Sequence, residues 1–132
     1  MAGINLFYNF SNNYEKQRQQ HKEALIKKNY QEIYNHELAH KNAGGSLAGD
    51  IVIERNSEGI PVGGHVNIKM PVLDKNNPQK TIDDANIVIR SAMAPSDPSE
   101  QDYKVANEAK NIKMQAQAIK DKNTGNKLDI KG

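Results

Sequence analysis

The stretch from Ser11 to Ala43 contains neither proline nor glycine, and this constrains the fold more than any other feature of the sequence. Its residues are mostly good helix formers, and the pair Gly44-Gly45 follows as a C-terminal stop signal. The pattern predicts one long helix from about Ser11 to Ala43. Near its end this helix carries the sequence His36-Glu37-Leu38-Ala39-His40.

Two short runs with β-type residues follow the predicted helix, at Asp50–Arg55 and at His65–Met70. They are separated by the turn-forming residues Asn56–Gly59 and by the pair Gly63-Gly64. This arrangement predicts a β-hairpin.

Two further helices are predicted in the second half of the chain. Thr81 and Asp84 resemble a capping box at the start of the first, and Pro95 ends it. Asp97-Pro98 supplies an N-cap and a favourable first residue for the second. Apolar residues then recur at helical spacing on one face of that helix, which we expect to pack inward: Val105, Ala109, Ile112, Ala116 and Ile119.

These elements predict an α+β fold, with a long motif-bearing helix, a β-hairpin and two further helices around one small core. A length of 132 residues with 36% hydrophobic residues fits a single domain with a modest core. We expect one domain over residues 1–132, with residues 1–10 and 121–132 as peripheral segments. Within the second segment, Lys127–Ile130 is expected to form a short strand or a docked end.

Charge and composition exclude several classes of function. The net charge is +2, and lysines alternate with acidic residues, so no basic patch for nucleic acid is expected. No apolar stretch could span a bilayer, so membrane insertion is not expected. The first ten residues have no basic region and no cleavage site of a signal peptide, which makes the cytoplasm the default location. Oligomeric state and substrate stay open.

The motif His36-Glu37-Leu38-Ala39-His40 matches the H-E-x-x-H pattern of zinc hydrolases, and it lies on a predicted helix, as that pattern requires. Two histidines four residues apart share one side of a helix, so both imidazoles can reach one ion. Glu37 can then act as the general base that activates a zinc-bound water. Glu37 also falls on the apolar stripe of Ile26 and Ile33, where an unpaired carboxylate would be costly.

A catalytic zinc needs a third protein ligand, and the absence of cysteine leaves histidine and carboxylates as candidates. His21 lies about 22 Å from His36 along the helix, too far to join the site. We therefore expect His65 to be the third ligand, although strand alternation places it on the more polar face, with Asn67 and Lys69. The carboxylates that could replace it are Asp50, Glu54 and Asp102.

Residues 31–109 resemble the SprA-related family, a bacterial family of candidate metallopeptidases. The resemblance rests on the motif with Gly44-Gly45, on Gly63–Val66 and, most specifically, on the run Ala92–Asp102. Family members usually carry glutamate where His65 stands, and either residue type can ligate zinc. Arg90 and Asp102 match polar positions of the family pattern.

The resemblance implies a zinc metallopeptidase that acts on a peptide or protein substrate. Arg90, Asp102 and Tyr103 would contact the transition state or hold the ligands in place, with Tyr103 as a donor to an oxyanion. Each has a more ordinary alternative as a capping, salt-bridge or packing residue. Two other readings stay open, a non-catalytic zinc-stabilised interaction module and an interaction domain in which the motif is incidental.

Overall fold

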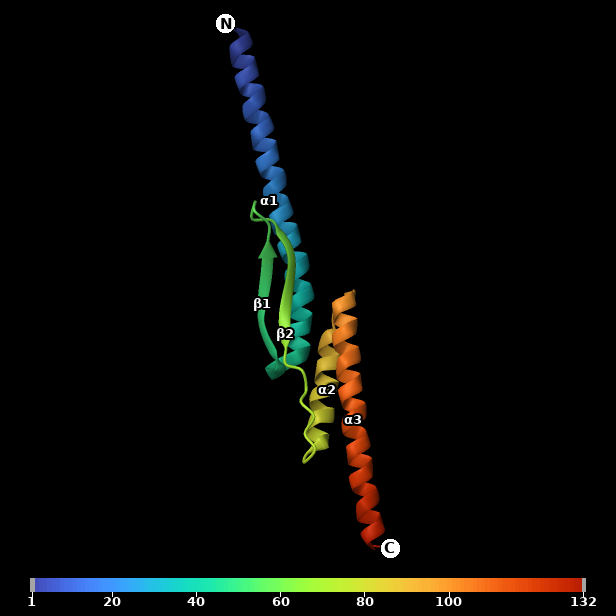
Figure 1. The fold of residues 1–132 in the computed structure, drawn as a ribbon. Helices are drawn as coiled ribbons and strands as arrows, with labels where there is room; N and C mark the ends of the chain where they lie inside the picture. The colour runs from blue at the N-terminus through green and yellow to red at the C-terminus, as the bar shows by residue number, and fades with distance from the viewer. Residues whose placement is uncertain (1, 132) are drawn as a thin grey trace. The chain divides into compact units, whose positions relative to one another are not determined.

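The computed structural model describes the backbone of residues 2–131 and the side chains of residues 9–125. The fold is α+β, as predicted, with three helices and one antiparallel β-hairpin (Figure 1). The elements in chain order are α1 (Ala2–Gly44), the short 3-10 turn η1 (Gly45–Leu47), β1 (Ala48–Arg55), β2 (Pro61–Ile68), α2 (Pro78–Ala92) and α3 (Glu100–Lys131).

Helix α1 confirms the predicted long helix but begins at Ala2, so residues 2–10 are part of it and not a separate segment. Its predicted end is confirmed. Gly45 directly after the helix has a φ of +53°, a left-handed conformation that favours glycine at a helix end. Gly44 itself is buried, and a Cβ there would meet the Ala48 Cβ at 2.9 Å and the Ser91 Oγ at 3.0 Å. The two glycines therefore end α1 and let β1 begin close beside it.

The hairpin is confirmed, but β2 begins four residues earlier than predicted and includes Gly63 and Gly64. The residues between the strands are 56–60, where the Asn56 side chain accepts hydrogen bonds from the amides of Glu58 and Ile60. Backbone hydrogen bonds join Asn56 to Ile60 and Lys69 to Leu47. The register that they set places His65 opposite Ile51.

Helix α2 begins at Pro78, before the predicted start at Thr81. Its N-cap is Asn77, whose side chain accepts a hydrogen bond from the Lys80 amide. Thr81 is buried inside the helix, where its hydroxyl donates to the Val72 carbonyl and accepts from the Asp74 amide, both at 2.9 Å. The predicted capping box at Thr81 is therefore wrong, because its hydroxyl holds the preceding loop.

Helix α3 begins at Glu100, and its cap is Ser99 in place of the predicted Asp97. The Ser99 hydroxyl accepts from the Asp102 amide at 3.1 Å, and the Asp102 carboxylate accepts from the Ser99 amide at 2.9 Å. This reciprocal pair is a capping box. The helix continues to Lys131, so the predicted short strand at Lys127–Ile130 is wrong. Whether this end is docked lies outside the residues whose side chains the structure describes. A single glycine, Gly125, costs only about 1 kcal/mol inside a helix and does not end it.

The chain divides into two compact units. The first comprises Met1–Asn35 and Ile53–Gly64, and the second comprises His36–Val52 and His65–Gly132. In the first unit the Asn29 side chain donates to the Pro61 carbonyl at 3.1 Å, and the Arg55 guanidinium lies 5.7 Å from the centre of the Tyr30 ring. These contacts tie the hairpin turn to α1. The expectation of a single domain stays a prediction.

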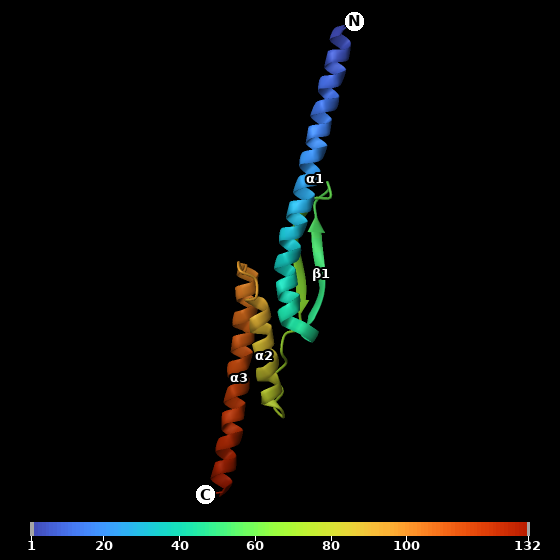
Figure 2. The ribbon, with the colours of Figure 1, turned by 180° about the vertical axis from the view of Figure 1, so that it is seen from behind.

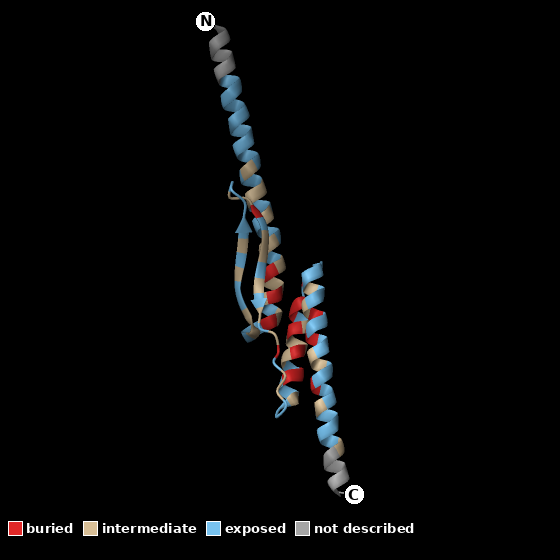
Figure 3. Ribbon diagram, in the orientation of Figure 1, coloured by how far each residue is buried: buried red, intermediate tan, exposed pale blue. Residues whose placement is uncertain are grey.

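The core of the second unit lies between α2 and α3, which run side by side in both views (Figure 1, Figure 2). Their facing sides hold most of the buried residues (Figure 3). The predicted inward face of α3 is confirmed, since Ala109 and Ala116 are fully buried. The buried apolar side chains are Ile82, Ala85, Val88, Ala92, Ala106, Ala109 and Ala116. Because most of them are alanines, the two helices pack closely around a thin core. Among the described residues, no helix has the length and apolar character to cross a bilayer.

Candidate metal centre

Three potential ligands meet in the second unit, two from the end of α1 and one from the start of α3. The Nε2 atoms of His36 and His40 are 3.3 Å apart. The Asp102 carboxylate lies 3.4 Å from the His36 Nε2 and 3.3 Å from the His40 Nε2. Tetrahedral zinc with bonds of about 2.0–2.1 Å separates neighbouring ligand atoms by roughly 3.3–3.4 Å. The two Nε2 atoms therefore have the spacing of neighbouring zinc ligands, and the Asp102 carboxylate faces them with one oxygen each, Oδ2 toward His36 and Oδ1 toward His40.

The other nitrogen of each imidazole is held by an oxygen. The His40 Nδ1 lies 2.7 Å from the Ser91 carbonyl oxygen, which can only accept, so this nitrogen carries the proton. The His36 Nδ1 lies 3.3 Å from a carboxylate oxygen of Asp97 and likewise donates. Such partners fix the tautomer and the ring orientation of histidines that bind metals. Both Nε2 atoms are thereby left with lone pairs that face each other.

The groups in this cluster favour the binding of a cation. Two imidazole lone pairs and one carboxylate converge, and all three are acceptors when the imidazoles are neutral. His40 is buried, and the Asp102 side chain is only 16% exposed, so solvent screens their repulsion poorly. A divalent ion at the centre, or protons on the imidazoles, would compensate it. The donor set of two imidazoles and one carboxylate fits zinc.

Glu37 lies beside these ligands on α1 and is buried, with 7% of its surface exposed. Its carboxylate and the imidazoles of His36 and His40 offer atoms that all lie within 4.8 Å of one another. Burial raises the pKa of the Glu37 carboxyl above its usual value, and the charge of Asp102 adds to this. The imidazoles of His40, His36 and His65 oppose the rise. The predicted burial of Glu37 is thus confirmed, and a raised pKa makes it a better proton acceptor.

Asp102 is brought to the histidines by the capping box with Ser99. The box fixes the third residue of α3, so one carboxylate oxygen accepts from the Ser99 amide while the carboxylate still faces both imidazoles. Asp102 therefore has two roles, as a helix cap and as a candidate metal ligand in the cluster. The sequence indicated Asp102 as one of three carboxylate alternatives and, through the resemblance, as a residue that contacts the transition state or holds the ligands in place.

His65, the expected third ligand, lies in β2 and is exposed. As alternation along β2 predicted, His65 is exposed together with Asn67 and Lys69, and the half-buried Ile51 lies opposite it on β1. The charge of His65 acts on Glu37, so it lies near the cluster. Its role as a ligand stays a prediction, while the measured spacing favours Asp102.

The remaining predicted residues lie at the surface. Asp50 is fully exposed and pairs with Lys41 at 3.3 Å, and Glu54 belongs to the first unit. Arg90 is exposed on α2, and half of the Tyr103 surface is exposed. His21 is exposed. The geometry therefore singles out His36, His40 and Asp102, with Glu37 beside them.

Ser91 is a supporting residue that sequence reasoning missed. It is fully buried on α2, and its hydroxyl donates to the His40 carbonyl at 2.7 Å while its own carbonyl accepts from the His40 ring. This reciprocal pair fastens His40 to α2. The sequence carries no signal for it, because a serine on an inward helix face is unremarkable in any local pattern.

Comparison with known proteins gives one match, to a family model. Searches of curated proteins and of solved structures give no significant match. The model of the SprA-related family matches residues 9–124, which include both histidines of the motif, Glu37, Ser91 and Asp102. Because this match covers nearly the whole chain, the protein belongs to the SprA-related family.

Proposed function

We propose that the protein is a zinc-dependent hydrolase, a metallopeptidase, whose ligands are His36, His40 and Asp102. The observation that carries this proposal is the convergence of two imidazoles and one carboxylate. The two Nε2 atoms are 3.3 Å apart, the Asp102 Oδ2 lies 3.4 Å from the His36 Nε2, and the Asp102 Oδ1 lies 3.3 Å from the His40 Nε2. Three protein ligands leave one position of a tetrahedral ion open, which is typical of catalytic zinc sites, whereas structural sites use four. The buried Glu37 beside the ligands adds a group that a structural site does not need.

The residues have separate tasks in such a hydrolysis. Zinc at this position would act as a Lewis acid that polarises the carbonyl of the substrate. Glu37 takes a proton from the attacking water and delivers it to the leaving amine. Asp97 and Ser91 hold the imidazoles in the orientation and tautomer that direct both Nε2 atoms to the centre. The substrate class, a peptide or protein, follows from the similarity of the motif to that of zinc peptidases.

Removal and return of the metal test this proposal. Purified protein loaded with one equivalent of zinc is incubated with a mixed peptide library, and new termini are identified by mass spectrometry. We expect cleavage by the zinc-loaded protein, loss of cleavage after chelation, and recovery when zinc is added back.

The matched control is His40→Ala prepared in the same way, which lacks one proposed ligand. We expect this variant to show no zinc-restored cleavage. Zinc retention without any cleavage by the wild-type protein would instead support the alternative of a zinc-stabilised interaction module. Cleavage that persists in His40→Ala would contradict the assignment of the site.

A further inference from the structure

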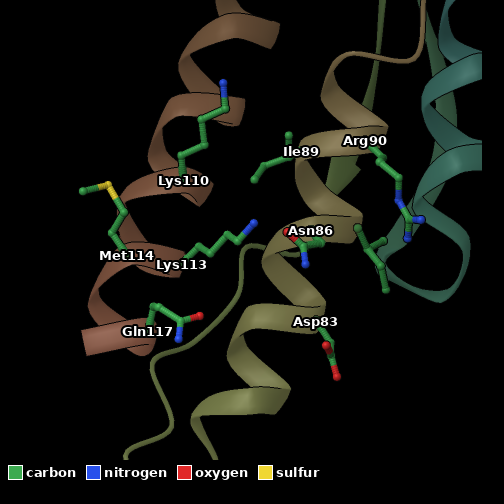
Figure 4. Close-up of a pocket in the computed structure, with 9 residues that line it drawn as sticks. Asp83, Asn86, Ile89, Arg90, Lys110, Lys113, Met114 and Gln117 are labelled. Atoms are coloured by element: carbon green, nitrogen blue, oxygen red, sulfur yellow. The ribbon is translucent and has the colours of Figure 1, made fainter. Parts of the chain in front are cut away.

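A groove of about 980 Å³ lies between α2 and α3, in the second unit (Figure 4). Its walls are residues 83–90 of α2 and 110–117 of α3, and we call it the α2–α3 groove. None of its lining residues is a proposed ligand of the metal centre. Any function of this groove is therefore separate from the hydrolysis proposed above.

The groove has apolar side chains that the helix pair does not use for its own core. The interface between the helices is already filled by buried residues such as Ala85, Val88 and Ala109. Ile87, Ile89 and Met114 line the groove; the two isoleucines are half-buried, and Met114 is 69% exposed. Exposed apolar groups gathered in a concave site, and not scattered singly, are typical of binding surfaces.

Three cations surround this apolar surface, namely Arg90, Lys110 and Lys113. Lys113 extends from α3 toward Asn86 on α2, as Figure 4 shows. Among the side chains of residues 9–125, none forms an ion pair or a hydrogen bond with any of the three cations. The single acidic residue of the groove, Asp83, accepts a hydrogen bond from the Gln79 side chain at 2.8 Å. The groove therefore has an excess of positive charge that nothing in the described chain neutralises.

We propose that the α2–α3 groove binds an acidic amphipathic helix of a partner protein. Each wall is two turns long, which fits apolar anchors at positions i, i+3 or i+4, and i+7 of a bound helix. Carboxylates that flank those anchors would pair with Arg90, Lys110 and Lys113. A third helix in this place would complete a three-helix bundle and remove Met114 from water.

A second copy of this chain fits the groove less well than an acidic partner does. A symmetric dimer brings the same surface of both copies together, and here it would set unpaired lysines against their own equivalents. Like charges placed opposite each other across an interface oppose association. Charge complementarity therefore favours an acidic partner over a second copy of this chain.

A synthetic probe tests this inference. The probe is a labelled peptide of about 18 residues, roughly five helical turns, with leucine on one face and glutamate elsewhere. Its binding to the full chain is measured by fluorescence anisotropy. We expect saturable binding that Lys110→Glu weakens by about tenfold. Met114→Asp is expected to weaken binding to a similar degree, because it places a carboxylate among the apolar anchors, and this carboxylate has the same charge as the glutamates of the peptide.

The matched control is Lys122→Glu, which makes the same charge change at an exposed position of α3 outside the groove and should leave binding unchanged. Far-UV circular dichroism verifies that each variant is folded. A scrambled peptide of equal composition should bind much more weakly, since it has no apolar face. Equal binding of the scrambled peptide or of a single-stranded oligonucleotide, or equal effects of Lys110→Glu and Lys122→Glu, would overturn the proposal.

Discussion

Asp102→Asn is expected to lower the affinity of the protein for zinc by more than about 100-fold. Even the loss of a residue that only supports a ligand lowers metal affinity by about 10–100-fold. The asparagine retains an oxygen that can accept from the Ser99 amide, so the cap of α3 is largely preserved. What disappears is the negative charge 3.3–3.4 Å from the two Nε2 atoms. Competition with a chromophoric chelator at fixed pH measures the affinity.

Two control variants separate the roles of the residues around this carboxylate. Ser99→Ala removes the hydroxyl of the capping box and should cost about 1 kcal/mol of stability while zinc affinity is retained. His65→Ala should also leave zinc affinity nearly unchanged. If His65→Ala lost zinc and Asp102→Asn kept it, the original expectation from the sequence would be right and the proposed ligand set would be wrong.

Glu37→Gln is expected to lower the rate of peptide hydrolysis by about 10²–10⁴-fold without loss of zinc. The glutamine has the shape of glutamate and fits the same buried position, but its amide cannot take a proton from water. Its burial next to His36 and His40 should therefore be kept while the chemistry is lost. Zinc content, melting temperature and the turnover rate of one identified substrate are measured on the same samples.

Glu32→Gln is the matched control, because Glu32 is an exposed residue about one and a half helical turns earlier on α1. It makes the same change of charge outside the cluster and should have wild-type activity. A Glu37→Gln enzyme that keeps full activity with zinc bound would show that another group takes the proton.

The sequence predicted those parts of the fold and of the site that depend on residues close together in the chain. The spacing of His36 and His40, the burial of Glu37 and the stop at Gly44-Gly45 all follow from helix geometry within a few turns. The inward face of α3 follows from the same periodicity. These features do not depend on how distant segments pack.

The capping signals were the weaker part of the sequence prediction, because several polar residues compete for each helix start. Thr81 and Asp97 are good caps in isolation, yet Asn77 and Ser99 occupy those positions. The choice depends on the loops before the helices. Thr81 is used to hold the loop of Val72 and Asp74, and Asp97 contacts His36.

The third candidate ligand, Asp102, and the contacts that support the site join residues that are far apart in the sequence. The Ser91 contacts to His40 join residues 51 positions apart, and the His36 contact to Asp97 spans 61 positions. Asp102 reaches the imidazoles only because the turn after α2 returns α3 to the end of α1. Sequence reasoning therefore preferred His65, the one remaining imidazole, and named Asp102 as an alternative, because the distance of Asp102 from the histidines depends on how α3 packs.

X-ray absorption at the zinc edge of the stoichiometric complex tests the ligand set most directly. We expect two imidazole nitrogens and additional oxygen ligands at about 2.0–2.1 Å, with the imidazole signal halved in His40→Ala and retained in His65→Ala. Three imidazoles in the wild-type protein, or a zinc environment that does not change in His40→Ala, would contradict a centre built from His36, His40 and Asp102.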